Sequence, residues 1–124
     1  LCELATGHRA GAGWRGVAGG ILGAGIHALT AMGHHAKDLV IHLGPAICGK
    51  CYAVGPDVYA RLMQRHVDAP APVDLRALLA DQARIAGVRE IDVSPLCTRC
   101  NNDRFFSHRA GDTGRQAAVI APSA

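Results

Sequence analysis

The stretch that sets the fold reads Gly11-Ala-Gly-Trp-Arg-Gly16 and continues as an apolar, glycine-rich segment to Met32. Val17, Ile26 and other apolar side chains recur there at spacings of three to five, which predicts one helix from Gly16 to Met32 with a single apolar face. Its glycines lower the intrinsic helix propensity by roughly 1 kcal/mol each relative to alanine, so close packing must hold this helix.

Beyond this helix, the chain alternates between strands and helices. Asp38–Leu43 is almost continuously apolar, which is typical of a strand covered on both faces. One helix opens at Gly55-Pro56-Asp57, and Asp74 and Gly87 are placed to cap and end another. The remaining expectations are a linker at Asp68–Val73 and strands at Glu90–Val93, Arg104–His108 and Gln116–Ala121. The alternation predicts a mixed α/β (α+β) fold, a layered mixed sheet with flanking helices.

Composition limits the class of protein. The chain has 124 residues, 49% of them hydrophobic and 19% charged, which suits one modest core. A net charge of +3 from scattered cations argues against a nucleic-acid partner. The longest apolar run, Val17–Met32, contains His27 and is shorter than the roughly 20 residues that span a bilayer, so no membrane partner is expected.

The cysteine count and the start of the chain complete these limits. Five cysteines, an odd number, and no pattern of a secretory signal favour a cytoplasmic protein. The chain begins at Leu1 and shows no complete element before Gly16. We therefore expect residues 1–124 to form a single partial domain, incomplete at its N-terminus.

Four of the cysteines form two pairs, Cys48-Gly-Lys-Cys51 and Cys97-Thr-Arg-Cys100. Four thiolates in two such loops would satisfy a tetrahedral zinc ion. Zinc ribbons usually separate their two loops by roughly 15–20 residues, whereas two predicted helices and a strand separate these pairs. The spacing therefore argues against a structural zinc, although a sheet would be able to bring the pairs together.

Three motifs follow one another in a fixed order along the chain. They are Gly11-Ala-Gly-Trp-Arg-Gly16, Gly44-Pro-Ala-Ile47, and Cys97-Thr98 with the following Phe105-Phe-Ser-His-Arg109 and Thr113-Gly-Arg115. In this order they resemble the C-terminal half of the laccase-domain family, also called multicopper polyphenol oxidase-like proteins. Most members of that family are regarded as zinc-dependent purine nucleoside phosphorylases.

The resemblance implies a reaction and its partners. It implies phosphorolysis of adenosine or inosine to the free base and ribose 1-phosphate, with a purine nucleoside and phosphate as ligands and zinc as cofactor. Family members are also linked to adenosine deamination, a hydrolase activity beside the transferase one, and to cleavage of methylthioadenosine.

The resemblance also assigns residues. The family has His-Ala-Gly-Trp-Arg-Gly, so Gly11 stands where a histidine ligand of the zinc is expected, and the other two ligands would lie in a missing N-terminal half. No metal ligand and no catalytic residue is therefore assigned in this chain. Arg15, near a helix N-terminus, and Ser107 and Arg109, on one face of a strand, are the candidates for binding substrate phosphate.

Other functions remain open. The chain would be a zinc-binding structural module if Cys48, Cys51, Cys97 and Cys100 met in space. It would alternatively be an inactive remnant, or a member of the same family that edits peptidoglycan precursors or oxidises polyphenols. The oxidase interpretation is disfavoured because the sequence lacks the His-x-His clusters that hold several copper ions.

Overall fold

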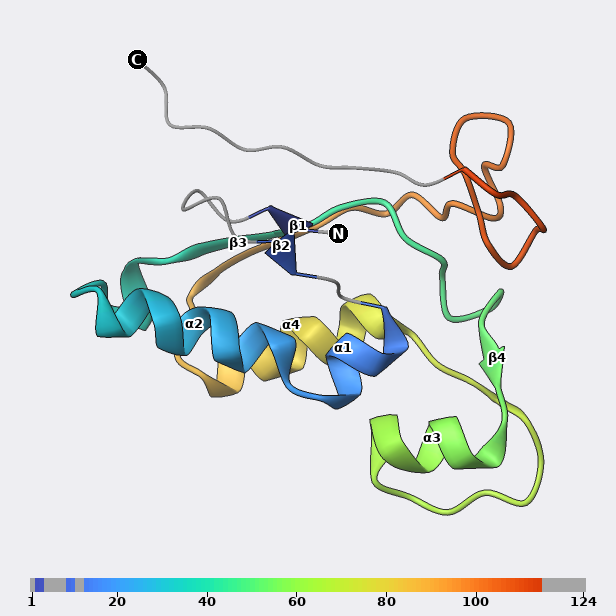
Figure 1. Ribbon diagram of the computed structural model, residues 1–124, viewed down its shortest axis with the longest axis horizontal. Coiled ribbons are helices and arrows are strands. Elements are labelled where there is room, and N and C mark those ends of the chain that lie inside the picture. The colour runs from blue at the N-terminus through green and yellow to red at the C-terminus, as the bar shows by residue number, and fades with distance from the viewer. Residues whose placement is uncertain (1, 4–8, 11–12, 115–124) are drawn as a thin grey trace.

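The computed structural model describes residues 2–3, 9–10 and 13–114. Figure 1 shows the elements in chain order. The helices are α1 (Trp14–Ala18), α2 (Ile21–Ala31), α3 (Pro56–Met63) and α4 (Leu75–Ile85), and a 3-10 turn lies at Ala36–Asp38. The strands are β1 (Cys2–Glu3), β2 (Arg9–Ala10), β3 (Val40–Leu43), β4 (Ala53–Val54), β5 (Ala71–Pro72) and β6 (Glu90–Val93).

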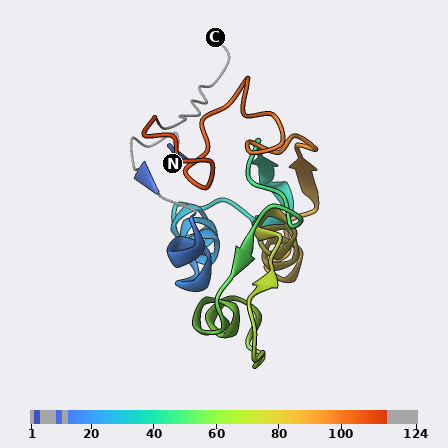
Figure 2. The ribbon, with the colours of Figure 1, turned by 90° about the vertical axis from the view of Figure 1, so that its right-hand side faces the viewer.

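The described strands pair two by two. β1 and β2 are antiparallel, as are β4 and β5, whereas β3 and β6 are parallel with Val40 opposite Glu90 and Leu43 opposite Val93. A parallel pair needs a long crossover, and here the chain from β4 to α4 supplies it. Helix α4 packs back against both strands, and α2 packs against α4, so the helices form a layer on one side of the pair (Figures 1 and 2). The mixed α/β prediction is confirmed.

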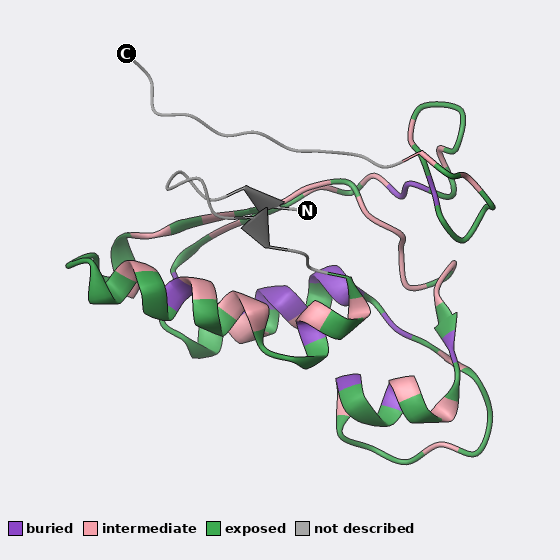
Figure 3. Ribbon diagram, in the orientation of Figure 1, coloured by how far each residue is buried: buried purple, intermediate pink, exposed green. Residues whose placement is uncertain are grey.

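The core has two parts, and Figure 3 shows that every helix contributes buried residues. In the larger part, α1, α3, α4 and β4 converge on the buried side chains of Val17, Val54, Tyr59, Leu62, Val73, Leu75 and Leu79. In the smaller part, Ile26 of α2 meets Ala83 of α4 and Val88. Helix α4 contributes to both parts and is therefore the element that joins them.

The helix predicted from Gly16 to Met32 is interrupted. It divides into α1 and α2 at Gly19 and Gly20, where Gly20 has a φ of 79°, a left-handed conformation that favours glycine. The break lets α1 contact α3 while α2 runs along α4. One of the glycines that lower the helix propensity of this segment, Gly20, is thus the residue at which α1 and α2 separate.

The strand predicted at Asp38–Leu43 is shorter than expected and is not covered on both faces. Asp38 is the last residue of the 3-10 turn and Leu39 follows it, and β3 alternates exposed and half-buried residues, with Val40 65% exposed. The segment expected as a linker, Asp68–Val73, includes β5. Helices α3 and α4 and strand β6 confirm their predictions, and Asp74 does cap α4 by accepting the Ala77 N–H at 3.1 Å.

The strand predicted at Arg104–His108 is absent, and this segment consists of successive turns. Local hydrogen bonds compete with strand formation here. Asn101 Nδ2 donates to the Cys97 carbonyl at 2.9 Å, and Asn102 Nδ2 donates to the Phe105 carbonyl at 3.0 Å. The predicted strand at Gln116–Ala121 lies outside the described residues. No helix in the described part of the chain is long and apolar enough to cross a membrane.

Candidate functional site

Arg15 and Trp14 form a cation–π pair at the start of α1. Trp14 is half-buried and packs against the larger core, as expected of a core aromatic, while Arg15 is exposed with its guanidinium carbon 4.6 Å from the indole centroid. Arg61 of α3 approaches the same ring at 5.9 Å. Since α1 has only five residues, any attraction for an anion here would come from the two guanidinium groups rather than from a helix dipole.

Arg109 is held by contacts at the start of strand β4. Its Nη1 donates to the Ala53 carbonyl of β4 at 2.8 Å, and its guanidinium carbon is 4.8 Å from the centroid of the Tyr52 ring. The side chain is exposed, and a guanidinium has five N–H donors, so this contact leaves donors for a ligand. Arg109 and Arg15 therefore rest on different aromatic rings, each held in position by that ring.

Ser107 belongs to the turn that precedes Arg109. The residue is only 5% exposed, and its Oγ accepts the Ala110 N–H at 3.4 Å. Its own N–H donates to Asp112 Oδ2 at 2.9 Å. Asn102 Nδ2 donates to the same Asp112 oxygen at 2.6 Å. The Ser107 N–H and this amide together hold the pKa of Asp112 below its usual value. The structure thus shows Ser107 in a hydrogen-bonded turn rather than beside Arg109 on a strand face.

The two cysteine pairs meet. The Sγ atoms of Cys48, Cys51, Cys97 and Cys100 all lie within 4.8 Å of one another. The spacing argument against a meeting was wrong because the helices between the pairs are the crossover that joins two neighbouring strands. Parallel strands end at the same edge of a sheet, and each pair follows one of them: Cys48 follows β3 and Cys97 follows β6. The parallel bridge between Ala46 and Cys97 continues that alignment.

The environment of the thiols is uneven. Cys97 is 4% exposed, and its Sγ accepts the N–H groups of Cys48 at 3.2 Å and Cys100 at 3.3 Å. Burial raises the pKa of Cys97, but these N–H groups outweigh burial and lower the pKa to about 6. Cys51 Sγ lies 3.5 Å from Cys100 Sγ, and this contact is the main reason that the pKa of Cys51 rises to about 12. All four thiols are free of disulfides.

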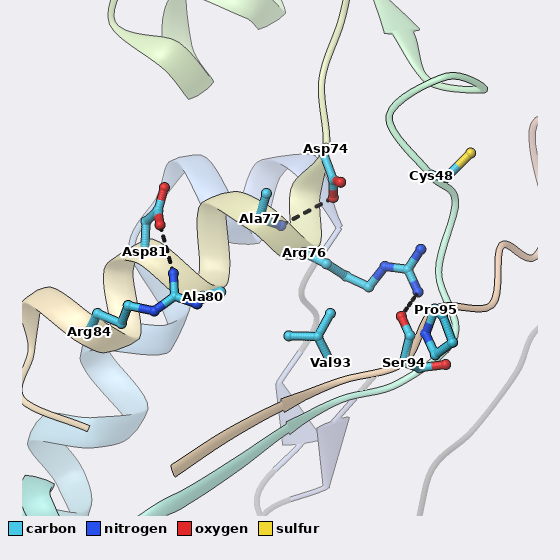
Figure 4. A pocket seen from close by; sticks show the side chains of 10 residues that line it. All are labelled: Cys48, Asp74, Arg76, Ala77, Ala80, Asp81, Arg84, Val93, Ser94 and Pro95. Atoms are coloured by element: carbon cyan, nitrogen blue, oxygen red, sulfur yellow. Dashed lines mark hydrogen bonds and ion pairs between the residues drawn. The ribbon is translucent and has the colours of Figure 1, made fainter. Parts of the chain in front are cut away.

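Sequence reasoning missed Arg76, which positions the second cysteine pair. It is 7% exposed, and its Nη1 donates to the carbonyls of Ser94 at 2.6 Å and Leu96 at 2.7 Å. Figure 4 shows the side chain reaching from α4 to the segment after β6, beside a cavity that Cys48 and Asp74 also line. The helical period was the available signal, since Arg76 shares the buried face of α4 with Leu79, Ala80 and Ala83.

The sequence matches a known family over nearly its whole length. The profile of the family described as multi-copper polyphenol oxidoreductase laccase matches residues 5–123, and the chain belongs to that family.

Curated relatives share the match. Purine nucleoside phosphorylase ORF3 of Streptomyces griseus is 32% identical over 117 residues, covering 88% of this chain and 47% of the relative. Purine nucleoside phosphorylase YlmD of Geobacillus stearothermophilus is 38% identical over 125 residues, covering 88% of this chain and 46% of the relative. The chain thus spans about half the length of the curated relatives it matches.

Solved structures agree with this placement. The crystal structure of YlmD from Geobacillus stearothermophilus superposes with a TM-score of 0.72 at 33% identity, over 78% of this chain and 41% of that one. YfiH of Bacillus licheniformis also gives a TM-score of 0.72, at 28% identity over 78% of this chain and 42% of that one. The described fold is therefore that of one part of these proteins.

Proposed function

We propose that this protein takes part in the phosphorolysis of purine nucleosides and that Arg15 and Arg109 bind the phosphate. Family membership, with relatives named purine nucleoside phosphorylase, is the observation that carries the proposal. In this reaction a phosphate oxygen attacks C1′ of the ribose as the bond from C1′ to the purine nitrogen breaks. The bonding electron pair leaves with the base, which takes up a proton, and ribose 1-phosphate forms.

Both arginines suit the phosphate. The guanidinium carries a permanent charge and a planar fork of N–H donors that matches phosphate oxygens. Each is fixed by an aromatic ring, Trp14 for Arg15 and Tyr52 for Arg109, so little side-chain freedom is lost when an anion binds. Ser107 is the weakest candidate, because its side chain is buried and its hydroxyl already accepts an N–H.

The zinc that the family implies does not fit the residues present. Gly11, outside the described residues, has no side-chain ligand at the position where the family has histidine. In the described part of the chain His42 and His66 each pair with one aspartate, but no histidine belongs to a group of three or more possible ligands, and the group of that size is the four cysteines. We derive no step through a catalytic metal and propose instead that an N-terminal half supplies what this chain lacks.

The test compares two proteins for phosphorolysis of adenosine and inosine with added zinc. One is this chain, and the other is this chain joined to the N-terminal half of a relative and carrying Gly11→His. We expect the chain alone to be inactive and the joined version to release base and ribose 1-phosphate. A joined version that folds and is as inert as the chain alone would remove the main support for this function.

In the active version, the arginines are tested separately. Arg109→Gln and Arg15→Gln should each raise the KM for phosphate by roughly tenfold or more, since each removes a charge-assisted contact. Arg89→Gln is the matched control, because Arg89 is an exposed arginine between α4 and β6. An unchanged KM for phosphate in both variants would contradict the assignment.

A further inference from the structure

Two loops with the same spacing of thiols close on each other at one edge of the β3–β6 pair. The first loop, Cys48–Cys51, leads toward β4, and the second, Cys97–Cys100, opens the turn-rich segment 97–114. Figure 1 shows this segment beyond the end of the two strands and away from α2 and α4. The cysteine cluster is therefore one place where segment 97–114 joins the rest of the molecule.

The distances suit a tetrahedral ion. With zinc–sulfur bonds of about 2.3 Å, the sulfurs of a tetrahedral site are about 3.8 Å apart. Here the four sulfurs lie within 4.8 Å of one another, and the Cys51–Cys100 separation is 3.5 Å. Small side-chain movements suffice to complete the site, and exposed Cys100 gives an ion access from solvent.

The surroundings suit bound thiolates. The N–H groups of Cys48 and Cys100 point at Cys97 Sγ, the type of contact that orients a sulfur ligand and offsets its charge. Four thiolates around a divalent ion carry a net double negative charge, and each loop contains one cation, Lys50 in the first and Arg99 in the second. Arg99 Nη1 also reaches across to the Cys51 carbonyl at 3.4 Å.

We propose that Cys48, Cys51, Cys97 and Cys100 bind one zinc ion that fastens segment 97–114 to the loop between β3 and β4. Binding replaces the thiol protons by the ion and releases them to solvent. Four protein ligands leave no open coordination position, so the ion is structural rather than catalytic. This zinc site does not depend on nucleoside chemistry, so its failure would be distinguishable from a failure of the proposed reaction.

The test is metal analysis of the protein purified under reducing conditions without chelators. We expect one zinc per chain and no visible absorption, with the zinc lost in Cys51→Ser and in Cys97→Ser. Cys2→Ser is the matched control, because it removes the fifth cysteine and should leave the zinc content unchanged. Zinc retained in Cys51→Ser, or metal-free protein in which the four thiols of the cluster and Cys2 are all reactive, would overturn the proposal.

Two further measurements keep the proposal testable if a variant fails to fold. Replacement of zinc by cobalt(II) in the unaltered protein should give the visible bands of a tetrahedral thiolate complex. Their absence would contradict the ligand set. Bound iron, or a disulfide between Cys51 and Cys100 in the purified protein, would contradict the zinc assignment directly.

Discussion

At the scale of single residues, buried Arg76 governs how the chain reaches the cysteine cluster. Its guanidinium satisfies the carbonyls of Ser94 and Leu96, three residues and one residue before Cys97. Arg76→Met should lower the free energy of unfolding by roughly 3 kcal/mol, because two charge-assisted bonds are lost and the Ser94 carbonyl loses this donor, while the Leu96 carbonyl keeps the Ala46 N–H at 3.3 Å. Urea denaturation measures the change.

Arg84→Met is the control for Arg76→Met on the same helix. Arg84 is exposed and forms an ion pair with Asp81, at 2.9 Å. Exposed pairs of this kind contribute about 0.2–1 kcal/mol. Equal losses in the two variants would show that the buried contacts of Arg76 do not carry the stabilisation.

Asp112 is the residue that gives segment 97–114 a dependence on pH. Contacts from Ser107 and Asn102 hold its folded-state pKa below the usual value, so the ionised carboxylate favours the folded turn. That contribution is fully present above the unfolded pKa, near 4, and is lost as pH falls through the folded value. Asp112→Ala should therefore speed amide exchange at Ser107 at neutral pH, with a smaller difference from the unaltered protein in acid.

Asp103→Ala, in the same segment, controls for the loss of a charge near Asp112. We expect amide exchange at Ser107 to be unchanged in this variant, since Asp103 is exposed. Equal effects of the two substitutions would point to net charge rather than to the hydrogen bonds of Asp112. Hydrogen exchange followed by mass spectrometry or NMR separates these results.

Much of the chemistry at this scale was readable from the sequence, but its geometry was not. The two cysteine pairs and the candidate arginines, Arg15 and Arg109, can be identified in the sequence itself. The position of Ser107 in a closed turn depends on side chains up to five residues away, such as Asp112, that compete with strand pairing. The meeting of Cys51 and Cys100 depends on which strands are neighbours, and that is a property of the whole sheet.

At the scale of elements, the sequence best predicted those helices whose ends are marked by capping residues. Helix α4 begins after its Asp74 cap and ends before Gly87. The φ of Gly87 is 96°, a left-handed conformation that favours glycine. The segment from Gly16 to Met32 has the periodicity of a helix but no such signals at its break. Among several glycines, only the backbone conformation distinguishes the one that ends α1.

Two glycine substitutions should therefore act in opposite directions. Gly20→Ala should lower the free energy of unfolding by about 1 kcal/mol, because its φ of 79° is strained for a side chain. Gly23→Ala should raise it by up to about 1 kcal/mol, because Gly23 lies inside α2 and a Cβ there meets nothing within 4 Å. Thermal unfolding of both variants checks the signs, and a single continuous helix would instead make both substitutions stabilising.

At the scale of the whole molecule, the packed helices and segment 97–114 are held by different means. Helix α4 joins both parts of the apolar core, and its Ala83, in the smaller part, is fully buried. Segment 97–114 has few buried residues, namely Cys97, Thr98 and Ser107. Hydrophobic burial therefore stabilises the helices, whereas the cysteine cluster and the Arg109 contact to Ala53 attach the segment.

Removal of metal should affect segment 97–114 but not the packed helices. If zinc joins the loops, a chelator should raise amide exchange across residues 98–114 and 48–52, while the amides of α4 stay protected because their burial is unaffected. The control is the same treatment of Cys51→Ser, where a chelator has no ion to remove and exchange in the segment should already be fast. Loss of protection across α4 as well would mean that the ion supports the whole fold. If the chelator changed no amide in the unaltered protein, thiol contacts and hydrogen bonds alone would hold segment 97–114.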